Sequence, residues 1–412
     1  MEEWKKVRLG NIVKINKNTY SVKENWNYVN YLDTGNIVKN MISKIQHIDL
    51  SKEKLPSRAK RKVCYNSIIY STVRPNQLHY GIIKEQPKNF LVSTGFTVID
   101  VNIEVANADF IYYILTQNDV IEHLQAIGEQ SVSAYPSIKS SDIEELEIML
   151  PSLSEQRKIV GILSSIDKNI NNNNKINNNL EQQAQELFKS WFIDAPESSS
   201  WESGTFSDII DTMIAGDWGK DSPTSNNTER VYCIRGADIP DVKSGNKGKM
   251  PTRFILPKNY AAKHLVDGDV VVEISGGSPT QSTGRIASIS QSLLDRYDKG
   301  MVCTNFCKAM KPKLGYSMFV YYYWQYLYDK KVFFLYENGT TGIKNLDISG
   351  FIETAPIVLP PAELVEKFDT FCHSVFDVIF ANGLQNEQLV NMRNALLPKL
   401  MSNELDVSNL DI

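Results

Sequence analysis

The chain carries two copies of one pattern, offset by about half of its 412 residues. A segment that begins at Trp4 is matched by one that begins at Trp201, an offset of 197 residues. Further on, the Ile-Met-Leu-Pro at 148–151 is matched by the Ile-Val-Leu-Pro at 357–360, an offset of 209. A repeat this long is a whole domain and not the roughly 20–50-residue unit of a solenoid. The sequence therefore predicts a tandem duplication of one two-part unit.

Other matched segments lie between these two points. They are residues 31–35 with 232–236, residues 92–96 with 302–306, and residues 110–113 with 319–322. The first part of each copy, its front, mixes β-branched runs with turn residues, which predicts a globular α+β fold.

The fronts contain recognisable strand and helix patterns. We expect strands at 63–70 and 269–274, where β-branched residues are bounded by turn formers, and helices at 109–117 and 317–328. The last of these helices is rich in tyrosine. We interpret its aromatic residues as core and surface packing and not as a platform for stacking.

The second part of each copy reads as one long helix. After Pro151 and Pro360, apolar residues recur at steps of three and four, which is the spacing of a coiled-coil seam. Forty helical residues would extend about 60 Å. Because each helix needs a partner for its seam, we expect the two copies to supply an antiparallel pair.

Two polar segments interrupt this pattern. The asparagine-rich run at 171–179 is unfavourable for a helix, because asparagine competes for backbone hydrogen bonds. We favour a kink or a solvated stretch within the helix over a true linker. Residues 195–200 are small and polar with one proline, and they read as the linker into the second copy.

Motifs for catalysis are missing from the sequence. It contains no Asn/Asp-Pro-Pro-aromatic loop of an amino-methyltransferase and no Walker A loop for ATP. The Gly276-Gly277 pair lacks dinucleotide spacing and reads as a tight turn. Cys303 and Cys307 have no further ligand at zinc spacing, so we expect buried thiols. We predict no catalytic residue and no metal site.

The cysteine pattern and the lack of long apolar runs indicate where the protein is located in the cell. Its five cysteines are scattered, no apolar run reaches the about 20 residues that span a bilayer, and the first residues lack an apolar signal segment. We expect a cytoplasmic prokaryotic protein without membrane contact.

Charge is unevenly distributed although the net charge is only −4. Residues 1–100 hold 17 Lys and Arg against 8 Asp and Glu, a local +9, and patches rather than averages bind polyanions. A loop after the first expected strand gathers side chains that can pair with base edges, and a basic run before that strand could hold phosphates. The predicted DNA-binding residues of the first front are Lys60, Arg61, Lys62, Arg74, Asn76, Gln77, His79, Ser133 and Tyr135.

The second front has polar loops at matching places but with different residues. Its predicted DNA-binding residues are Ser278, Thr280, Gln281, Thr283, Arg285, Thr341 and Lys344. For any single residue, the simpler interpretation is the solvated turn of a hairpin, and the argument for base contacts is that polar loops recur at matching places in both copies. Two copies of one frame with different loops would read two different half-sites.

The whole pattern resembles the specificity subunits of type I restriction–modification enzymes. The resemblance is carried by the Leu-Pro-Ser-Leu-Ser-Glu-Gln-Arg-Lys-Ile-Val stretch at 150–160 and its echo at 359–363, and by residues 232–239, 275–285 and 341–346. It extends over nearly the whole chain, and the two-copy arrangement is more specific than any single motif. The second copy departs from the pattern, because Leu364 and Val365 stand where Gln and Arg are expected.

The resemblance implies an α+β fold with two tandem target recognition domains, separated by two long antiparallel coiled-coil helices in a pseudo-twofold repeat. The recognition domains would be residues 1–150 and 195–359, and the spacer helices residues 151–194 and 360–412. Each domain would read one half of a bipartite site in double-stranded DNA.

The resemblance also implies partners. Two methyltransferase subunits, one per half, would dock on the helices, and restriction subunits would join through that core. The expected subunit-binding residues are Ile159, Ile166, Leu180, Leu187, Phe368, Val375, Leu389 and Leu396. S-adenosylmethionine, ATP and magnesium would belong to the partners, leaving this chain non-catalytic. The alternatives are an assembly scaffold with inert fronts and a nuclease with an unrecognised site.

Overall fold

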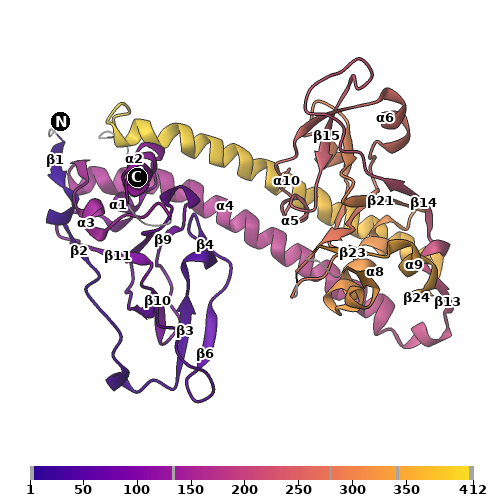
Figure 1. Cartoon of the computed structure of the whole chain (residues 1–412), viewed down its shortest axis with the longest axis horizontal. Helices are drawn as coiled ribbons and strands as arrows, with labels where there is room; N and C mark the ends of the chain where they lie inside the picture. The colour runs from indigo at the N-terminus through magenta and orange to yellow at the C-terminus, as the bar shows by residue number, and fades with distance from the viewer. Residues whose placement is uncertain (1–3, 132–134, 279, 340–342, 408–412) are drawn as a thin grey trace. The chain divides into compact units, whose positions relative to one another are not determined.

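The computed structural model describes residues 4–131, 135–278, 280–339 and 343–407, and the chain divides into two compact units. The first unit joins Met1–Asp167 to Asn391–Ile412, and the second is Lys168–Val390. Each unit holds one front and parts of both long helices (Figure 1).

The first front is built from short strands in small sheets. The strands are β1 Lys5–Arg8, β2 Val13–Ile15, β3 Tyr28–Leu32, β4 Ile37–Val38, β5 Met41–Ile42, β6 Gln46–Asp49, β7 Ala59–Arg61, β8 Ile68–Ser71, β9 Tyr80–Ile82, β10 Phe90–Ser93, β11 Phe96–Val101 and β12 Glu147–Leu150. One four-stranded sheet has the order β2-β11-β8-β9 and another the order β6-β3-β10-β7. Strands β1 and β12 form a separate pair, as do β4 and β5.

The central strand β8 is shorter than the sequence predicted. It begins at Ile68, whereas the β-branched pattern placed its start at 63. The preceding residues form a turn in which the Cys64 amide donates to Ser67 Oγ at 2.9 Å and Asn66 has a φ of 70°. Once in the sheet, β8 is buried at every position.

Three helices complete the first front, α1 Ala108–Leu115, α2 Asn118–Glu129 and α3 Ser140–Glu144. Asn107 caps α1 by accepting from the amide of Phe110 at 3.2 Å. The Asn107 amide in turn donates to Gln156 Oε1 at 2.7 Å, and the fully buried Gln156 side chain donates to the Pro151 carbonyl at 2.9 Å. The glutamine of the 150–160 stretch therefore fastens the front to the long helix.

The second front repeats this plan. Its strands are β13 Glu202–Thr205, β14 Ile210–Ala215, β15 Glu229–Ile234, β16 Thr252–Ile255, β17 Val270–Glu273, β18 Ser275–Gly276, β19 Ile286–Ser288, β20 Met301–Cys303, β21 Cys307–Pro312, β22 Glu337–Asn338, β23 Lys344–Leu346 and β24 Pro356–Leu359. Its helices are α5 Ile239–Lys243, α6 Pro257–Lys263, α7 Gln291–Leu294, α8 Ser317–Asp329 and α9 Ile348–Thr354. The sheet orders are β14-β21-β17-β19, β16-β15-β20, β18-β23-β22 and β13-β24.

Strand register confirms the duplication. Lys5 lies opposite Leu150 in the first copy, and Glu202 lies opposite Leu359 in the second, at the offsets of 197 and 209 found in the sequence. The parallel pair β3–β10 likewise recurs as β15–β20. At the offset of 209, Val365 and not Leu364 stands at the position of Gln156, which corrects the sequence alignment by one residue. Val365 is fully buried, so an apolar contact replaces the hydrogen-bonded glutamine in the second copy.

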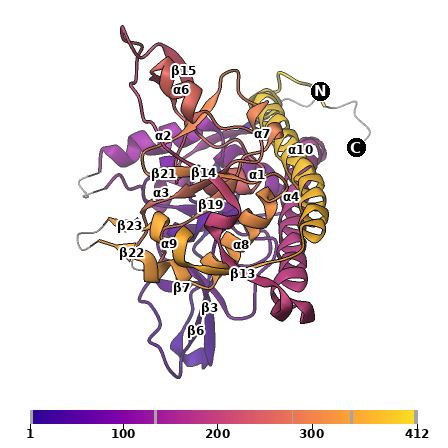
Figure 2. The same cartoon turned by 90° about the vertical axis from the view of Figure 1, so that its right-hand side faces the viewer.

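The core of the second unit is aromatic. Helix α8 lies between the sheet and the two long helices (Figure 2), and Tyr321, Tyr322 and Trp324 on it are buried. Phe188 of the first long helix packs with its ring centroid 5.7 Å from that of Phe319. Trp324 Nε1 donates to the Gly284 carbonyl at 2.8 Å. The interpretation of this stripe as core packing is confirmed.

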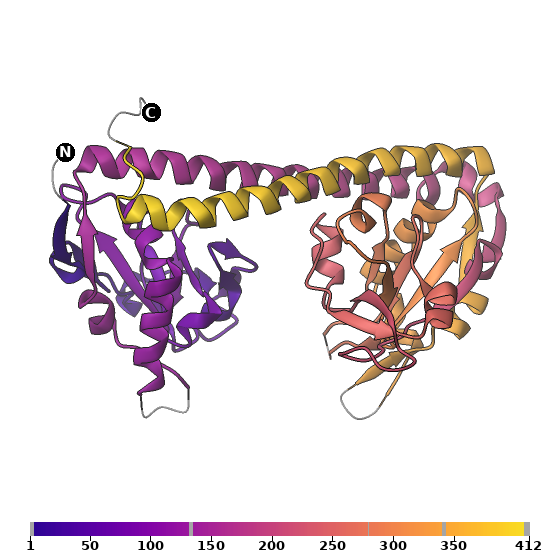
Figure 3. The same ribbon diagram turned by 90° about the horizontal axis from the view of Figure 1, so that it is seen from above.

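The long helices are α4 Leu153–Phe188 and α10 Ala362–Met401, and in each unit a part of one lies beside a part of the other (Figure 3). In the first unit Asp167 pairs with Arg393 at 2.8 Å. In the second unit Phe188, at the end of α4, packs with its centroid 5.7 Å from that of Phe368, near the start of α10. The pairing is therefore antiparallel, as predicted.

The asparagine run at 171–179 is a mostly solvated stretch within the helix, as predicted, but it contains two asparagines that are buried. Helix α4 is continuous through it, and Asn173 and Asn177 are only 9% and 3% exposed. Asn173 Nδ2 donates to Asn386 Oδ1 of α10 at 3.0 Å, and Asn177 Nδ2 donates to the Ile379 carbonyl at 3.1 Å. The asparagines form a polar ladder between the helices, the kind of contact that fixes helix register.

Candidate nucleic-acid interface

The loop after β8 presents polar side chains of the first front. A 3-10 turn, Pro75–Gln77, is flanked by Arg74 and Leu78, both in the left-handed region with φ of 49° and 62°. This sharp turn leaves Asn76 and Gln77 exposed. The Arg74 guanidinium lies 4.3 Å from the centroid of the Tyr135 ring, which is 56% exposed. The structure thus brings together two predicted residues that are 61 positions apart.

His79, in the same loop, contacts other groups of the chain through both of its ring nitrogens. Its Nδ1 lies 2.6 Å from the Ile37 carbonyl, and its Nε2 lies 3.2 Å from Gln77 Oε1. Both ring nitrogens are therefore used within the chain, and the side chain positions Gln77.

The basic run before β8 is less available than its sequence implied. Lys60 is exposed, but Arg61 is half-buried, and burial lowers the pKa of its guanidinium. Lys62 forms an ion pair with Glu24, and its Nζ lies 5.2 Å from the centroid of the Trp26 ring. Of the three, Lys60 is the cation best placed to meet a phosphate.

The second front presents a short polar turn after β18. Thr280 and Gln281 are exposed, and the Gln281 amide donates to Ser278 Oγ at 3.0 Å. This contact shapes the turn, and the exposed Gln281 side chain is hydrogen-bonded to Tyr328.

Three predicted residues of the second front are held by buried carboxylates. Thr283 is fully buried and donates from its Oγ1 to Glu337 Oε1 at 2.9 Å, and Lys344 pairs with Glu337 Oε2 at 2.8 Å. Arg285 donates from Nε and Nη2 to Glu273 at 2.7 and 2.6 Å, and this bond raises the pKa of Arg285. The structure assigns these side chains internal contacts, which corrects their interpretation as base readers. Ser133 and Thr341 lie outside the described residues.

The seam residues of the helices divide into two groups. Ile159, Ile166, Phe368 and Val375 are buried in the cores of their own units, and Leu180, Leu187, Leu389 and Leu396 are partly buried. The buried four leave no surface for another subunit, which corrects their interpretation as docking contacts. Exposed apolar residues lie elsewhere on the helices of the second unit, at Ile176, Phe371, Val378 and Leu384.

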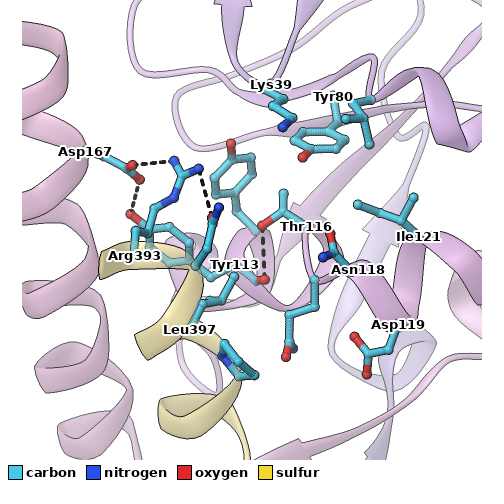
Figure 4. Close-up of a pocket in the computed structure, with 15 residues that line it drawn as sticks. Lys39, Tyr80, Tyr113, Thr116, Asn118, Asp119, Ile121, Asp167, Arg393 and Leu397 are labelled. Atoms are coloured by element: carbon cyan, nitrogen blue, oxygen red, sulfur yellow. Dashed lines mark hydrogen bonds and ion pairs between the residues drawn. The ribbon is translucent and has the colours of Figure 1, made fainter. Parts of the chain in front are cut away.

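A cavity of about 460 Å³ in the first unit was not predicted (Figure 4). Asp167 lies at its wall and accepts from Tyr113 Oη at 2.7 Å and from Arg393 Nη1 at 2.8 Å. Burial raises the pKa of Tyr80, which also lines the cavity, to about 12. The phenols therefore stay protonated, and the paired charges fasten α1 to both long helices.

A second cavity, of about 490 Å³, lies in the second front beside β17 and β18. Trp218 and Phe306 line it, together with Glu273 and Arg235. The repeat pattern gave no sign of it, because Trp218 lies outside the matched segments and Phe306, although matched to Phe96, is exposed where Phe96 is buried.

The cysteines of the second front lie in its core. Cys303 and Cys307 are buried thiols, as predicted, and burial raises the pKa of Cys307 to about 12. Among the described residues, no three His, Cys, Asp or Glu side chains are grouped to hold a metal ion. No helix in the described part of the chain is long and apolar enough to cross a membrane.

Comparison with known proteins gives a consistent result. Residues 1–182 match the family described as type I restriction modification DNA specificity domain. The chain is 33% identical to the HindI specificity subunit of Haemophilus influenzae, over 98% of this chain and 100% of that protein. It is 30% identical to the MjaIX specificity subunit of Methanocaldococcus jannaschii, over 74% and 70% of the two chains. The crystal structure of the type I restriction–modification S subunit of M. genitalium has the same fold, with a TM-score of 0.53 at 17% identity over 98% and 97% of the chains.

Proposed function

The chain belongs to the family of type I restriction enzyme specificity subunits, and on this premise we propose that each of its fronts reads one half of a bipartite sequence in double-stranded DNA. The observation that carries this proposal is that both fronts share one strand arrangement but present loops with different residues. Strand register is repeated between the copies. The exposed loop after β8 offers Arg74, Asn76 and Gln77, whereas the loop after β18 offers Thr280 and Gln281.

These loops suit the two kinds of contact that DNA recognition needs. Arg pairs with the O6 and N7 of guanine, and Asn and Gln pair with the N6 and N7 of adenine. The Tyr135 ring supports Arg74 in one orientation, so less conformational freedom is lost on binding. Lys60 in the first front is placed for a phosphate.

We propose that the helices carry the partner subunits. Ile176, Phe371, Val378 and Leu384 are between 39% and 45% exposed on helices whose seams are already filled. Apolar side chains exposed in this way are suited to bury against two methyltransferase subunits, one per half, with restriction subunits joining the assembly. S-adenosylmethionine, ATP and magnesium would then act in those partners, and this chain would supply specificity without catalysis.

Exchange of the fronts tests the proposal. Because β1–β12 and β13–β24 close each front in the same register, residues 202–359 can replace residues 5–150 at equivalent strand positions. The variant, expressed with its methyltransferase subunit, should methylate a symmetrical motif that contains the second half-site twice. The reciprocal exchange should give a motif with the first half-site twice.

Methylome sequencing reads out both exchanges. A folded exchange variant that still methylates the wild-type motif would contradict the assignment of one half-site to each front. If neither the wild-type chain nor the variants specify any motif, the fronts are inert spacers and the scaffold alternative holds.

A further inference from the structure

The 490 Å³ cavity of the second front has the form of a binding site and not of a packing defect. Its volume lies within the about 300–1,000 Å³ of small-molecule sites. Trp218 and Phe306 line it while remaining 38% and 62% exposed. Two exposed aromatic side chains therefore give the cavity an apolar border.

Arg253 fixes the position of Trp218 by packing against one face of its indole ring. The Arg253 guanidinium lies 4.1 Å from the centroid of its ring, and Arg253 Nε donates to the Trp218 carbonyl at 2.8 Å. Arg253 is itself 5% exposed and paired with Asp221. One face of the indole is therefore occupied by a fixed cation, and the other is left for a flat ligand.

Glu273 brings a carboxylate to the cavity. It is 6% exposed, and Arg285 neutralises it through two hydrogen bonds, yet each of its oxygens keeps a lone pair. Gly236 keeps this carboxylate accessible, because a Cβ there would lie 2.4 Å from Glu273 Oε1. The cavity thus combines aromatic walls with an acceptor for N–H groups.

The cavity adjoins the loop proposed to read DNA. Ser275, at the start of β18, lines it, and the exposed Thr280 and Gln281 follow a few residues later. Arg235 also lines the cavity, and Asp238 holds its guanidinium through hydrogen bonds of 2.9 and 3.1 Å. In the first front, the strand partner of Thr97, which is matched to Cys307, is Tyr70, and so a tyrosine stands where Glu273 stands in the second front. The carboxylate therefore belongs to one copy.

We propose that this cavity receives one base of the second half-site, turned out of the duplex and stacked against Trp218 and Phe306, with Glu273 accepting from an amino or ring N–H group of that base. The inference rests on the proposed function. A paired base cannot enter a cavity bordered by two rings, whereas an unpaired base offers both its faces and its Watson–Crick edge. Stacking on aromatic side chains is the general means of holding such bases.

Mismatched duplexes test this inference in the complex of the full chain with its methyltransferase subunits. A mismatch lowers the cost of turning a base out. At one position of the second half-site, a mismatch should therefore tighten binding of the wild-type complex about tenfold or more. That gain should disappear in Trp218→Ala and Phe306→Ala, which should also bind the matched site roughly 5- to 150-fold more weakly.

Matched variants separate stacking from loss of fold. Phe306→Tyr keeps an aromatic ring and should retain the mismatch gain, and Leu314→Ala, which truncates a fully exposed apolar side chain of the same unit, should behave as wild type. Glu273→Gln should alter the base preferred at the sensitive position.

The outcomes distinguish this inference from the proposed function. Sequence-specific binding in which no mismatch gain depends on Phe306 or Trp218 would overturn the base-binding cavity alone. Binding without any sequence preference would overturn the proposed function and this inference with it.

Discussion

Asn177 is the residue of the asparagine run whose removal should destabilise the protein most clearly. Its Nδ2 donates to the Ile379 carbonyl at 3.1 Å and to the Ser244 carbonyl at 3.2 Å, and its Oδ1 accepts from Asn382 Nδ2 at 2.8 Å. With 3% of its surface exposed, the side chain has almost no access to water that could replace these bonds.

The magnitude follows from these three hydrogen bonds. A buried polar group that loses its partner costs about 1–3 kcal/mol, and a typical hydrogen bond contributes about 1 kcal/mol net. Alanine favours the helix over asparagine by roughly 0.5 kcal/mol. We therefore expect Asn177→Ala to lower the free energy of unfolding of the second unit by about 2–4 kcal/mol.

Asn178→Ala is the matched control, because Asn178 is exposed on the same helix. There the helix preference of alanine acts alone, and we expect a gain of roughly 0.5 kcal/mol. Urea unfolding followed by tryptophan fluorescence measures both variants, since Trp191, Trp201, Trp218 and Trp324 all lie in the second unit. Equal effects of the two substitutions would refute the polar ladder.

Further substitutions probe the interface and the core. Arg74→Ala should weaken binding to one half-site by about 1–3 kcal/mol in binding assays. Arg74→Lys should not restore that binding, because a lysine lacks the two-pronged donor geometry of arginine. Equal loss of binding at both half-sites would contradict the assignment of Arg74 to one of them. Arg285→Ala should lower the free energy of unfolding by about 3–5 kcal/mol, because the substitution leaves the Glu273 carboxylate buried without its partner. If the variant keeps wild-type stability but has altered DNA specificity, Arg285 reads a base instead. His373 Nε2 donates a hydrogen bond to the Asp369 carboxylate, which raises the pKa of His373. The stabilisation is therefore present below the unfolded-state pKa of about 6.5 and is lost as pH rises through the folded-state value. His373→Gln should destabilise at about pH 5.5 and have little effect at pH 8 in thermal unfolding, and the opposite pH dependence would disprove the pairing.

Long-range regularities were predictable from the sequence. The two-copy plan, the antiparallel helices and the buried tyrosines of α8 follow from patterns that extend over many residues, and the structure confirms each of them. Periodicity identifies such features because burial of one face imposes it on every turn of a helix.

Side-chain partners were harder to predict, because they come from distant parts of the chain. Arg285 was interpreted as a base reader until the structure placed Glu273 beside it, and Lys62 is likewise engaged by Glu24. The asparagine run was judged by helix propensity alone, which carries no information about acceptors on α10. Composition identifies which side chains can bind DNA, but only the fold shows which of them are free to do so.

Methylome sequencing of a host that carries the methyltransferase subunit, with and without this chain, tests the central claim most directly. We predict a bipartite motif, with two different half-sites and an unread gap, that is modified only when the chain is present. A motif that is modified equally in its absence, or a single uninterrupted motif in its presence, would contradict the account of two fronts that each read one half-site.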